Sequence, residues 1–334
     1  MLLAAGRRVI IYDRRGFGKS SQPTTGYNYD TFAEDLHKLV THLKLGNFAL
    51  VGFSMGGGEV ARYVGKYGSK NVSKAVIIGG VPPFLLKTAD NPEGVDGSVF
   101  EGIQKAVAAD RYAFFTEFFK NFYNTDLLLG KRISEQAVQA GWNVAATASA
   151  TASLACVPRW HEDFRKDMAR IDVPTLVIHG GADRIVPLAA SGQRTAKLIK
   201  GARLVVAKDG PHAAVWTHAD EVNAELVSFL GKSVAHQASP ETGGGVSRAA
   251  SKSRLHRRVP SKTGTQPYLA KLTSANPGGF PPGLRRSSAA AQQNNRLGRK
   301  GASQNADANF PGFVRQLSGQ FHWRPDGFSI HRLD

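Results

Sequence analysis

The sequence predicts an α/β fold in which a mostly parallel sheet is covered by helices, followed by a tail of a different kind. Three observations support this prediction. Short β-branched runs alternate with helical patterns up to residue 234, one serine lies between glycines where such a run gives way to a helical pattern, and the composition changes near residue 235. With 334 residues, 42% of them hydrophobic, the chain can bury a large core.

Five apolar runs are the expected strands. Each is short, rich in β-branched residues and bounded by polar residues or glycine, which is typical of strands buried on both faces of a sheet. Because helical patterns separate most of them, we expect the strands to be parallel. The runs are VIIYD at 9–13, FALVGF at 48–53, KAVIIG at 74–79, PTLVIHG at 174–180 and RLVVA at 203–207.

Two helical patterns flank the second of these runs. Apolar residues recur at helical spacing from Phe32 to Leu43, and Asp30 or Thr31 can cap the start of that helix. The stretch GGGEVARYVGKYG, residues 56–68, predicts a second helix that packs closely on the sheet.

Residues 82–170 break the alternation of strands and helices. They open with PPFLL and contain no convincing strand, so we expect a helical cap inserted after the third strand. We interpret an aromatic stripe in this segment as core packing rather than as a ligand site: Phe114, Phe115, Phe118, Phe119 and Phe122. The chain then divides into α/β core segments at 1–81 and 171–234, the helical cap at 82–170 and a tail at 235–334.

The tail carries most of the basic charge. Residues 235–334 hold 15 Lys and Arg against 4 Asp and Glu, and they are rich in Ser, Gly, Pro, Gln and Asn without a sustained apolar period. Such a composition predicts a basic, disordered tail. Its charge could attract nucleic acid or another anionic polymer. No RNA-binding aromatic run or zinc spacing accompanies the charge, so we favour a solvated extension.

Cysteine content and hydropathy point to a cytoplasmic protein. Cys156 is the only cysteine, so no disulfide can form within the chain, and we interpret it as a buried, unreactive thiol. The N-terminal stretch MLLAAGRRVIIYDRRG lacks the basic start and long apolar region of a signal peptide. No run approaches the ~18 apolar residues that a membrane-spanning helix needs.

Ser54 is the candidate nucleophile. The stretch Gly52-Phe-Ser-Met-Gly56 is a G-x-S-x-G motif with an expected buried strand before it and an expected helix after it. In a nucleophile elbow this context holds the serine on a strained turn above the sheet, and the helix N-terminus favours developing negative charge. The alternative is that Ser54 is only a turn residue, and the strand–turn–helix context argues against it.

Asp183 and His212 are the candidate acid and base. A serine nucleophile needs a base, and the base needs an acid that orients it, in the chain order Ser, Asp, His for this architecture. Asp183 follows the fourth expected strand, although it could instead be a loop acid or a helix N-cap, and His212 follows the fifth. His179 ends a buried strand, so we expect its replacement to affect stability more than chemistry.

Five segments of the chain together resemble the α/β-hydrolase family of cofactor-free bacterial haloperoxidases, also called perhydrolases or arylesterases. This resemblance implies that Ser54 is the nucleophile, His212 the base, Asp183 the orienting acid and the Met55 backbone N–H an oxyanion donor. It also implies small ester or carboxylic acid substrates, hydrogen peroxide and halide as further reactants, and no metal or other cofactor. It leaves a homo-oligomer open. The segments are VIIYDRRGFGKSSQPTTGYNYDTFAEDLHKLVTHL, LVGFSMGGGEVARYVGKYG, AVIIGGVPPFLLKT, IDVPTLVIHGGADRIVP and DGPHAAVWTHADEVNAELVSFL.

The chain departs from the family pattern at its N-terminal side. The family's sheet has eight strands, and the five runs resemble its fourth to eighth. The stretch with a His-Gly-aromatic turn, which supplies the second oxyanion N–H, is not found, so we expect an N-terminally truncated chain with impaired activity. Its loss leaves the edges of the strands at 9–13 and 48–53 unpaired or forces another pairing. The alternative functions are a catalytically weakened fragment and a binder of anionic polymers that acts through the tail.

Overall fold

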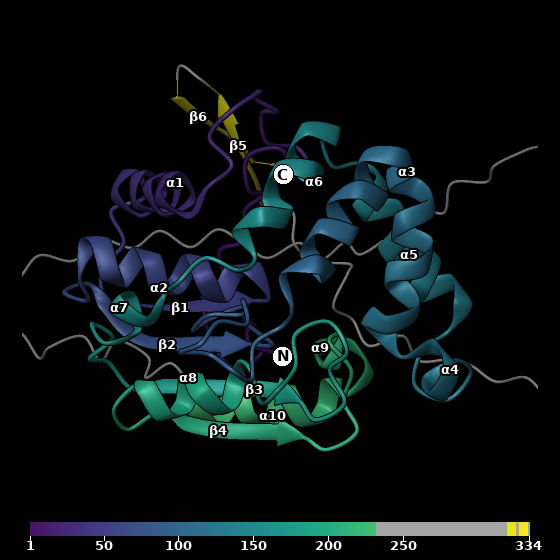
Figure 1. Cartoon of the computed structure of the whole chain (residues 1–334). Helices are drawn as coiled ribbons and strands as arrows, with labels where there is room; N and C mark the ends of the chain where they lie inside the picture. Colours follow the sequence, from purple (N-terminus) through teal and green to yellow (C-terminus); the bar gives the residue numbers. More distant parts are fainter. Residues whose placement is uncertain (232–318, 325–326, 333–334) are drawn as a thin grey trace, which may run out of the picture. The chain divides into compact units, whose positions relative to one another are not determined.

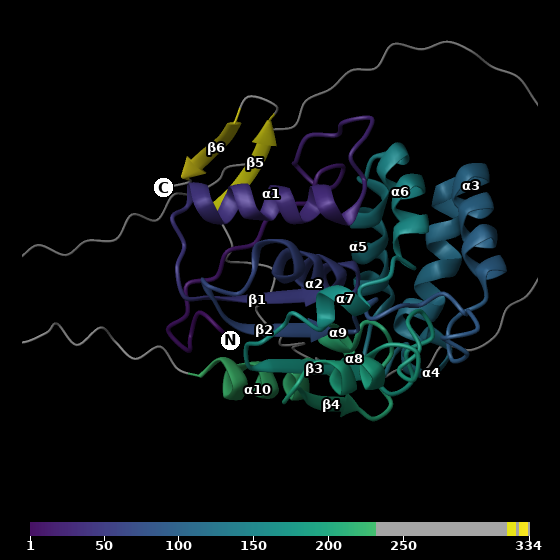
Figure 2. The same cartoon turned by 60° about the vertical axis from the view of Figure 1, so that its left-hand side comes forward.

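The computed structural model describes residues 1–231, 319–324 and 327–332 (Figures 1 and 2). Its main sheet has four parallel strands in the order β1-β2-β3-β4. Because the strands are parallel, their carboxyl ends meet at one edge of the sheet, where open α/β sheets place their sites. The strands are β1 (Phe48–Phe53), β2 (Val72–Ile78), β3 (Thr175–Gly180) and β4 (Arg203–Ala207).

The predicted strand at residues 9–13 does not form. β1 is an edge of the four-stranded sheet, and residues 9–13 pair with no strand of it. A strand needs a neighbour for its backbone hydrogen bonds, and residues 9–13 form no backbone hydrogen bond with any described strand. Side chains hold the segment instead: Tyr12 and Arg14 both donate hydrogen bonds to the buried carboxylate of Glu59.

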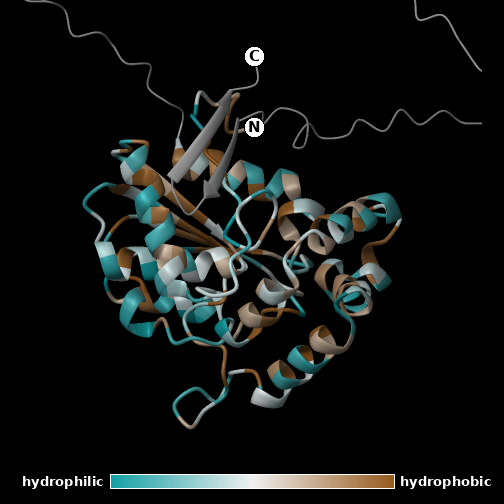
Figure 3. Cartoon of the chain, turned by 90° about the horizontal axis from the view of Figure 1, so that it is seen from above, coloured by the Kyte–Doolittle hydropathy of each residue, from teal (hydrophilic) through white to brown (hydrophobic). Residues whose placement is uncertain are grey.

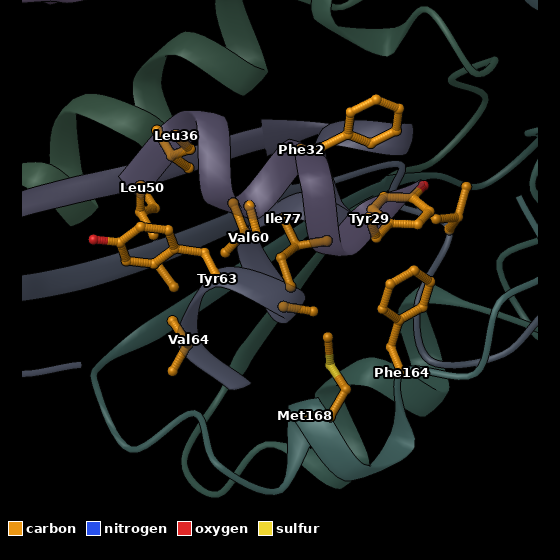
Figure 4. Packing of buried hydrophobic residues seen from close by; sticks show 14 of the residues in the cluster. Tyr29, Phe32, Leu36, Leu50, Val60, Tyr63, Val64, Ile77, Phe164 and Met168 are labelled. Atoms are coloured by element: carbon orange, nitrogen blue, oxygen red, sulfur yellow. The ribbon is translucent and has the colours of Figure 1, made fainter. Parts of the chain in front are cut away.

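One face of the sheet packs against α1 (Tyr29–His42) and α2 (Met55–Tyr67). Asn28, rather than Asp30 or Thr31, caps α1, because its side-chain oxygen accepts a hydrogen bond of 2.9 Å from the Thr31 N–H. Figure 4 shows side chains from both helices in one buried cluster with Ile77 of β2 and with Phe164 and Met168 at α7 (Arg165–Met168). Each such large apolar side chain contributes ~1.5–3 kcal/mol by burial.

The opposite face of the sheet packs against α10 (Ala219–Leu230). Alternate residues of β2 point to opposite faces of the sheet. Ala75 and Ile77 belong to the hydrophobic cluster that includes residues of α1 and α2, whereas Val76 and Ile78 belong to the cluster that contains Leu226 of α10. Short helices α8 (Gly192–Leu198) and α9 (Ala214–Thr217) follow β3 and β4. In Figure 3 the brown, hydrophobic strands lie between helices that carry teal, hydrophilic residues.

The segment between β2 and β3 is helical, as predicted. In Figures 1 and 2 its longer helices lie beside the carboxyl ends of the strands. The longest helix is kinked at Asp110, whose carboxylate caps its second half by accepting from the N–H groups of Tyr112 and Ala113. The elements are α3 (Gly97–Tyr123), α4 (Thr125–Leu128), α5 (Glu135–Ala146), α6 (Ala150–Cys156), a 3-10 turn (Val157–Arg159) and α7.

Part of the tail forms an antiparallel pair of strands that the sequence analysis did not predict. β5 (Gly319–Arg324) pairs with β6 (Gly327–Arg332), with Phe321 opposite Ile330. The predicted disorder of residues 235–318 falls outside the described residues. Within the described part of the chain, no helix is both long enough and apolar enough to cross a bilayer.

Candidate active site

Ser54 lies on a sharp turn between β1 and α2. Its backbone has φ 54° and ψ −119°, a left-handed conformation that is strained for a residue with a side chain. Three backbone hydrogen bonds hold it: its N–H donates to the Ile78 carbonyl at 2.9 Å, and its carbonyl accepts from Gly57 at 2.9 Å and Val81 at 3.3 Å. The turn therefore has the strand–turn–helix geometry of a nucleophile elbow.

His212 connects Ser54 to Asp183. Its Nε2 lies 2.9 Å from Ser54 Oγ, and its Nδ1 lies 2.8 Å from Asp183 Oδ2. The carboxylate can only accept, so Nδ1 carries the proton and Nε2 accepts a hydrogen bond from the Ser54 hydroxyl. The structure thus brings together the three side chains that the sequence analysis selected, from the loops after β1, β3 and β4.

The Asp183 carboxylate is fully buried and hydrogen-bonded on both oxygens. Oδ1 accepts from the N–H groups of Ile185 at 2.9 Å and Val186 at 2.8 Å, and Oδ2 faces His212 and His179. Burial alone would raise the pKa of this carboxyl, but the hydrogen bonds from His179 and His212 outweigh it and hold the pKa well below its usual range. Asp183 is therefore an anion that can orient and stabilise a protonated His212.

Two aromatic rings enclose His212. The Phe53 ring centroid lies 5.1 Å from the imidazole centroid, and that of Phe122 lies 5.0 Å away in an edge-on arrangement. His212 is 2% exposed, so the rings and the surrounding loops keep water from most of the imidazole. Phe122 belongs to the aromatic stripe of α3 and packs with Phe119 and Tyr123, in agreement with the interpretation of the stripe as core packing, and its ring also contacts His212.

The end of α3 also forms hydrogen bonds with the two loops that carry His212 and Asp183. The Phe122 carbonyl accepts a hydrogen bond of 3.0 Å from Ala213 N–H, next to His212. Asn124, buried and in a left-handed conformation, donates through Nδ2 to the Ala182 carbonyl at 2.9 Å, next to Asp183. These contacts connect the helical segment between β2 and β3 to the positions of the base and the acid.

The Met55 N–H opens α2 directly beside Ser54. Among the described residues it has no hydrogen-bond partner, as expected for the first N–H groups of a helix. This N–H can therefore donate to a negative oxygen that develops near Ser54 Oγ.

A surface hollow of about 530 Å³ lies between α3, α4 and the loop after Asp183. None of Ser54, Asp183 and His212 lines it, and its charged groups already form the ion pairs Lys120–Glu117 and Arg184–Asp126. We assign it no part in the chemistry. Within the described ranges, no group of three or more His, Cys, Asp and Glu side chains is arranged to hold a metal ion.

Residues 2–219 match the family described as alpha/beta hydrolase fold. The chain belongs to this family. A presumed non-heme chloroperoxidase of Synechocystis sp. is 64% identical over 230 residues, which are 69% of this chain and 83% of the relative. A bifunctional esterase/perhydrolase of Acinetobacter calcoaceticus is 34% identical over 229 residues, or 68% of this chain and 83% of that one.

The crystal structure of a bromoperoxidase from Bacillus anthracis has the same fold as this α/β hydrolase. The two superpose with a TM-score of 0.67 at 47% identity, over 69% of this chain and 83% of the other. The comparison agrees with the predicted family and fold class.

Three residues beside the site of this α/β hydrolase escaped the sequence analysis. Phe122 was assigned to core packing, His179 to the end of a buried strand, and Asn124 was not singled out. A signal existed for His179, because a polar residue in a buried strand, four residues before the candidate acid, needs a partner. For Asn124 no comparable sequence pattern stands out.

Proposed function

We propose that this α/β hydrolase cleaves small carboxylic esters through an acyl-serine on Ser54, and that hydrogen peroxide can replace water in the second half of the reaction. The observation that carries the proposal is the hydrogen-bonded chain Ser54–His212–Asp183 at the nucleophile elbow. In this proposal Ser54 is the nucleophile, His212 the general base and Asp183 the acid that orients His212.

Acylation follows from the geometry of the three side chains. Ser54 Oγ attacks the ester carbonyl carbon while His212 Nε2, 2.9 Å away, takes the hydroxyl proton. The Met55 N–H donates to the resulting oxyanion, and the Asp183 anion stabilises the imidazolium. His212 then returns the proton to the leaving alcohol oxygen, the carbon–oxygen bond of the alcohol breaks, and the acyl group stays on Ser54.

Deacylation repeats these steps with a new nucleophile. Water attacks the acyl carbon while His212 takes its proton. The bond between that carbon and Ser54 Oγ then breaks, His212 returns the proton to Oγ, and the carboxylic acid leaves. Hydrogen peroxide in place of water gives the peracid. The peracid then oxidises a halide ion to the hypohalous acid and is itself reduced to the carboxylic acid, so this step does not depend on Ser54.

The names of the relatives support both branches of the proposal. One relative is named as a bifunctional esterase/perhydrolase, and others are named as chloroperoxidase or bromoperoxidase. The apolar rings of Phe53 and Phe122 beside His212 also support a small, uncharged acyl group.

The same proposal includes the organisation and setting of the chain. The segments 1–81 and 171–234 form the catalytic core, and the cap at 82–170 covers the site. The hydrogen bonds of Phe122 and Asn124 to the loops of the core support this arrangement.

A cytoplasmic location is supported by the single cysteine, which can form no disulfide within the chain. The proposal leaves a homo-oligomer open, and size-exclusion chromatography with light scattering tests for one.

Ester turnover with and without peroxide tests the proposed reaction. The chain is given p-nitrophenyl acetate, and p-nitrophenol release and bromide oxidation are followed in parallel. We expect both activities in the wild type, neither in Ser54→Ala, and both in Ser73→Ala, whose hydroxyl is on β2 and forms only a bond of 3.4 Å to the Asn47 carbonyl. Ester hydrolysis by Ser54→Ala at the wild-type rate would overturn the proposal, and ester hydrolysis without bromide oxidation would overturn its peroxide branch.

A further inference from the structure

A second histidine faces the Asp183 carboxylate. His179 is in β3, one residue before its end, and its side chain is fully buried. Its Nε2 lies 3.3 Å from Asp183 Oδ2 and 2.8 Å from the Val186 carbonyl oxygen. Oδ2 is the oxygen that accepts the hydrogen bond from His212, so both imidazoles converge on one atom.

The partners of His179 determine its tautomer. Both neighbours of Nε2 are acceptors, so Nε2 carries a proton. Nδ1 is buried and has no hydrogen-bond partner among the described residues, and it lies against Gly192 of α8, where an added Cβ would be 2.6 Å from it. A proton on Nδ1 would be buried without an acceptor, which is costly, so the ring is neutral and its N–H is directed at Oδ2 and Val186.

We infer that His179 is a positioning residue, which fixes Asp183 in the orientation that His212 needs. The inference rests on the proposed roles of Ser54, His212 and Asp183.

The turn after β3 shows how His179 fixes this orientation. Asp183 Oδ1 is held by the N–H groups of Ile185 and Val186. The His179 Nε2 N–H donates to the Val186 carbonyl at 2.8 Å and also faces the other carboxylate oxygen at 3.3 Å. The carboxylate therefore cannot rotate about its Cβ–Cγ bond without losing several buried hydrogen bonds.

The surroundings of Asp183 limit what else could do this. The titratable groups that contact its carboxylate are His179 from β3 and His212 from the loop after β4. From the side of α8, His179 meets Gly192, which has no side chain, and from α3 the Phe122 ring contacts His212. His179 is therefore the side chain, apart from His212, that donates to Asp183 within the described residues.

Two substitutions separate positioning from packing. His179→Phe keeps a ring of similar shape and removes the N–H, whereas His179→Gln places an amide N–H close to the position of Nε2. Loss of the donor leaves more negative charge on Oδ2, which strengthens its attraction for protonated His212. The acid limb of kcat/KM therefore moves to higher pH.

The test measures kcat/KM for p-nitrophenyl acetate against pH, with thermal melting, for both variants and the wild type. We expect an about tenfold fall for His179→Phe with little change in KM, a shifted acid limb, and substantial recovery of both in His179→Gln. The inference would be overturned if neither variant shifted the acid limb and if the loss of kcat/KM in each variant followed its fall in melting temperature. If His179→Phe does not fold, the inference still requires that the acid limb of kcat/KM in His179→Gln lie at the same pH as in the wild type.

A readout that needs no turnover separates this inference from the proposed function. The low-field proton NMR resonance of the His212–Asp183 hydrogen bond and the titration of the His212 ring are recorded for the same chains. A wild type without esterase activity would overturn the proposed function alone. A His212 titration that is the same in wild type and His179→Phe would overturn the positioning role alone.

Discussion

Gly52 and Gly56, the two glycines around Ser54, are not equivalent. A Cβ at Gly52 would overlap the Gly56 carbonyl group and lie 2.7 Å from the Gly57 nitrogen, whereas a Cβ at Gly56 would meet nothing within 4 Å. The strand that leads to Ser54 therefore approaches the first turn of α2 so closely that only glycine fits at position 52. The strained conformation of Ser54 depends on this approach.

Gly52→Ala should disrupt the tight turn between β1 and α2 that holds Ser54. We expect a loss of stability at or above the upper end of the ~1–3 kcal/mol typical of overpacking, because the overlapping atoms belong to the backbone, and a large loss of ester hydrolysis. Gly56→Ala is the matched control. It should leave the free energy of unfolding unchanged or raise it by up to ~1 kcal/mol, so that the melting temperature does not fall. Equal destabilisation of the two variants in thermal melts would contradict this account.

Asn124 should contribute to the stability of the fold in two separate ways, through its side-chain hydrogen bond and through its backbone conformation. Asn124→Gly keeps the left-handed conformation and loses the bond to Ala182, so we expect a loss of ~0.5–1.5 kcal/mol. Asn124→Ala should lose about 1–2 kcal/mol more than Asn124→Gly, because alanine has a Cβ at φ 48° and lacks the polar side chain with which asparagine tolerates this conformation. Urea unfolding of both variants measures the difference. If Asn124→Ala is the more stable of the two, the assigned conformation is wrong.

Asp183 should make the fold sensitive to acid. Its pKa in the folded chain is held below the value in the unfolded chain, about 3.9, so its contribution to stability is complete above that pH and is lost as the pH falls further. Asp183→Asn should therefore lose less melting temperature than wild type between pH 5 and pH 3. Glu101→Gln, an exposed carboxylate of α3, controls for the loss of one negative charge. A steeper loss in Asp183→Asn than in wild type would refute the assignment.

Cys156 should be inert in the folded chain. Burial raises the pKa of its thiol to about 11, so the reactive thiolate is scarce at pH 8 and the sulfur is also shielded. We expect no iodoacetamide adduct on the native chain and one adduct per chain in guanidinium chloride, measured by intact mass. Alkylation of the native chain at the rate of a free thiol would contradict this prediction, because it would show that the surroundings of Cys156 open to solvent.

The sequence predicted the parts of the fold that depend on local patterns. Strands form at four of the predicted runs, 48–53, 74–79, 174–180 and 203–207, because each is a short apolar run with a partner strand beside it. Burial on both faces holds for the central strand β3, whereas Val51 and Val206 of the edge strands β1 and β4 are exposed. The run at 9–13 has the same local character, but strand formation needs a partner for the backbone, and periodicity says nothing about partners.

The site was predictable to the extent that it follows chain order and strand ends. Ser54, Asp183 and His212 each follow a strand in the expected order, and their side chains form a hydrogen-bonded chain. The Asn124 bond to Ala182 comes from packing between distant segments, so Asn124 carried no local motif. His179 lies only four residues before Asp183, and its place in a buried strand was the signal that it needs a partner.

Covalent labelling tests the central claim, that Ser54 is a nucleophile activated by His212, most directly. The chain is incubated with a fluorophosphonate probe, and the adduct is counted by intact mass and located by peptide mapping. We predict one adduct per chain on Ser54, none in Ser54→Ala, and labelling slowed by about 10³-fold or more in His212→Gln. Labelling of Ser54→Ala at the wild-type rate, or no label on a chain that melts cooperatively, would contradict the account.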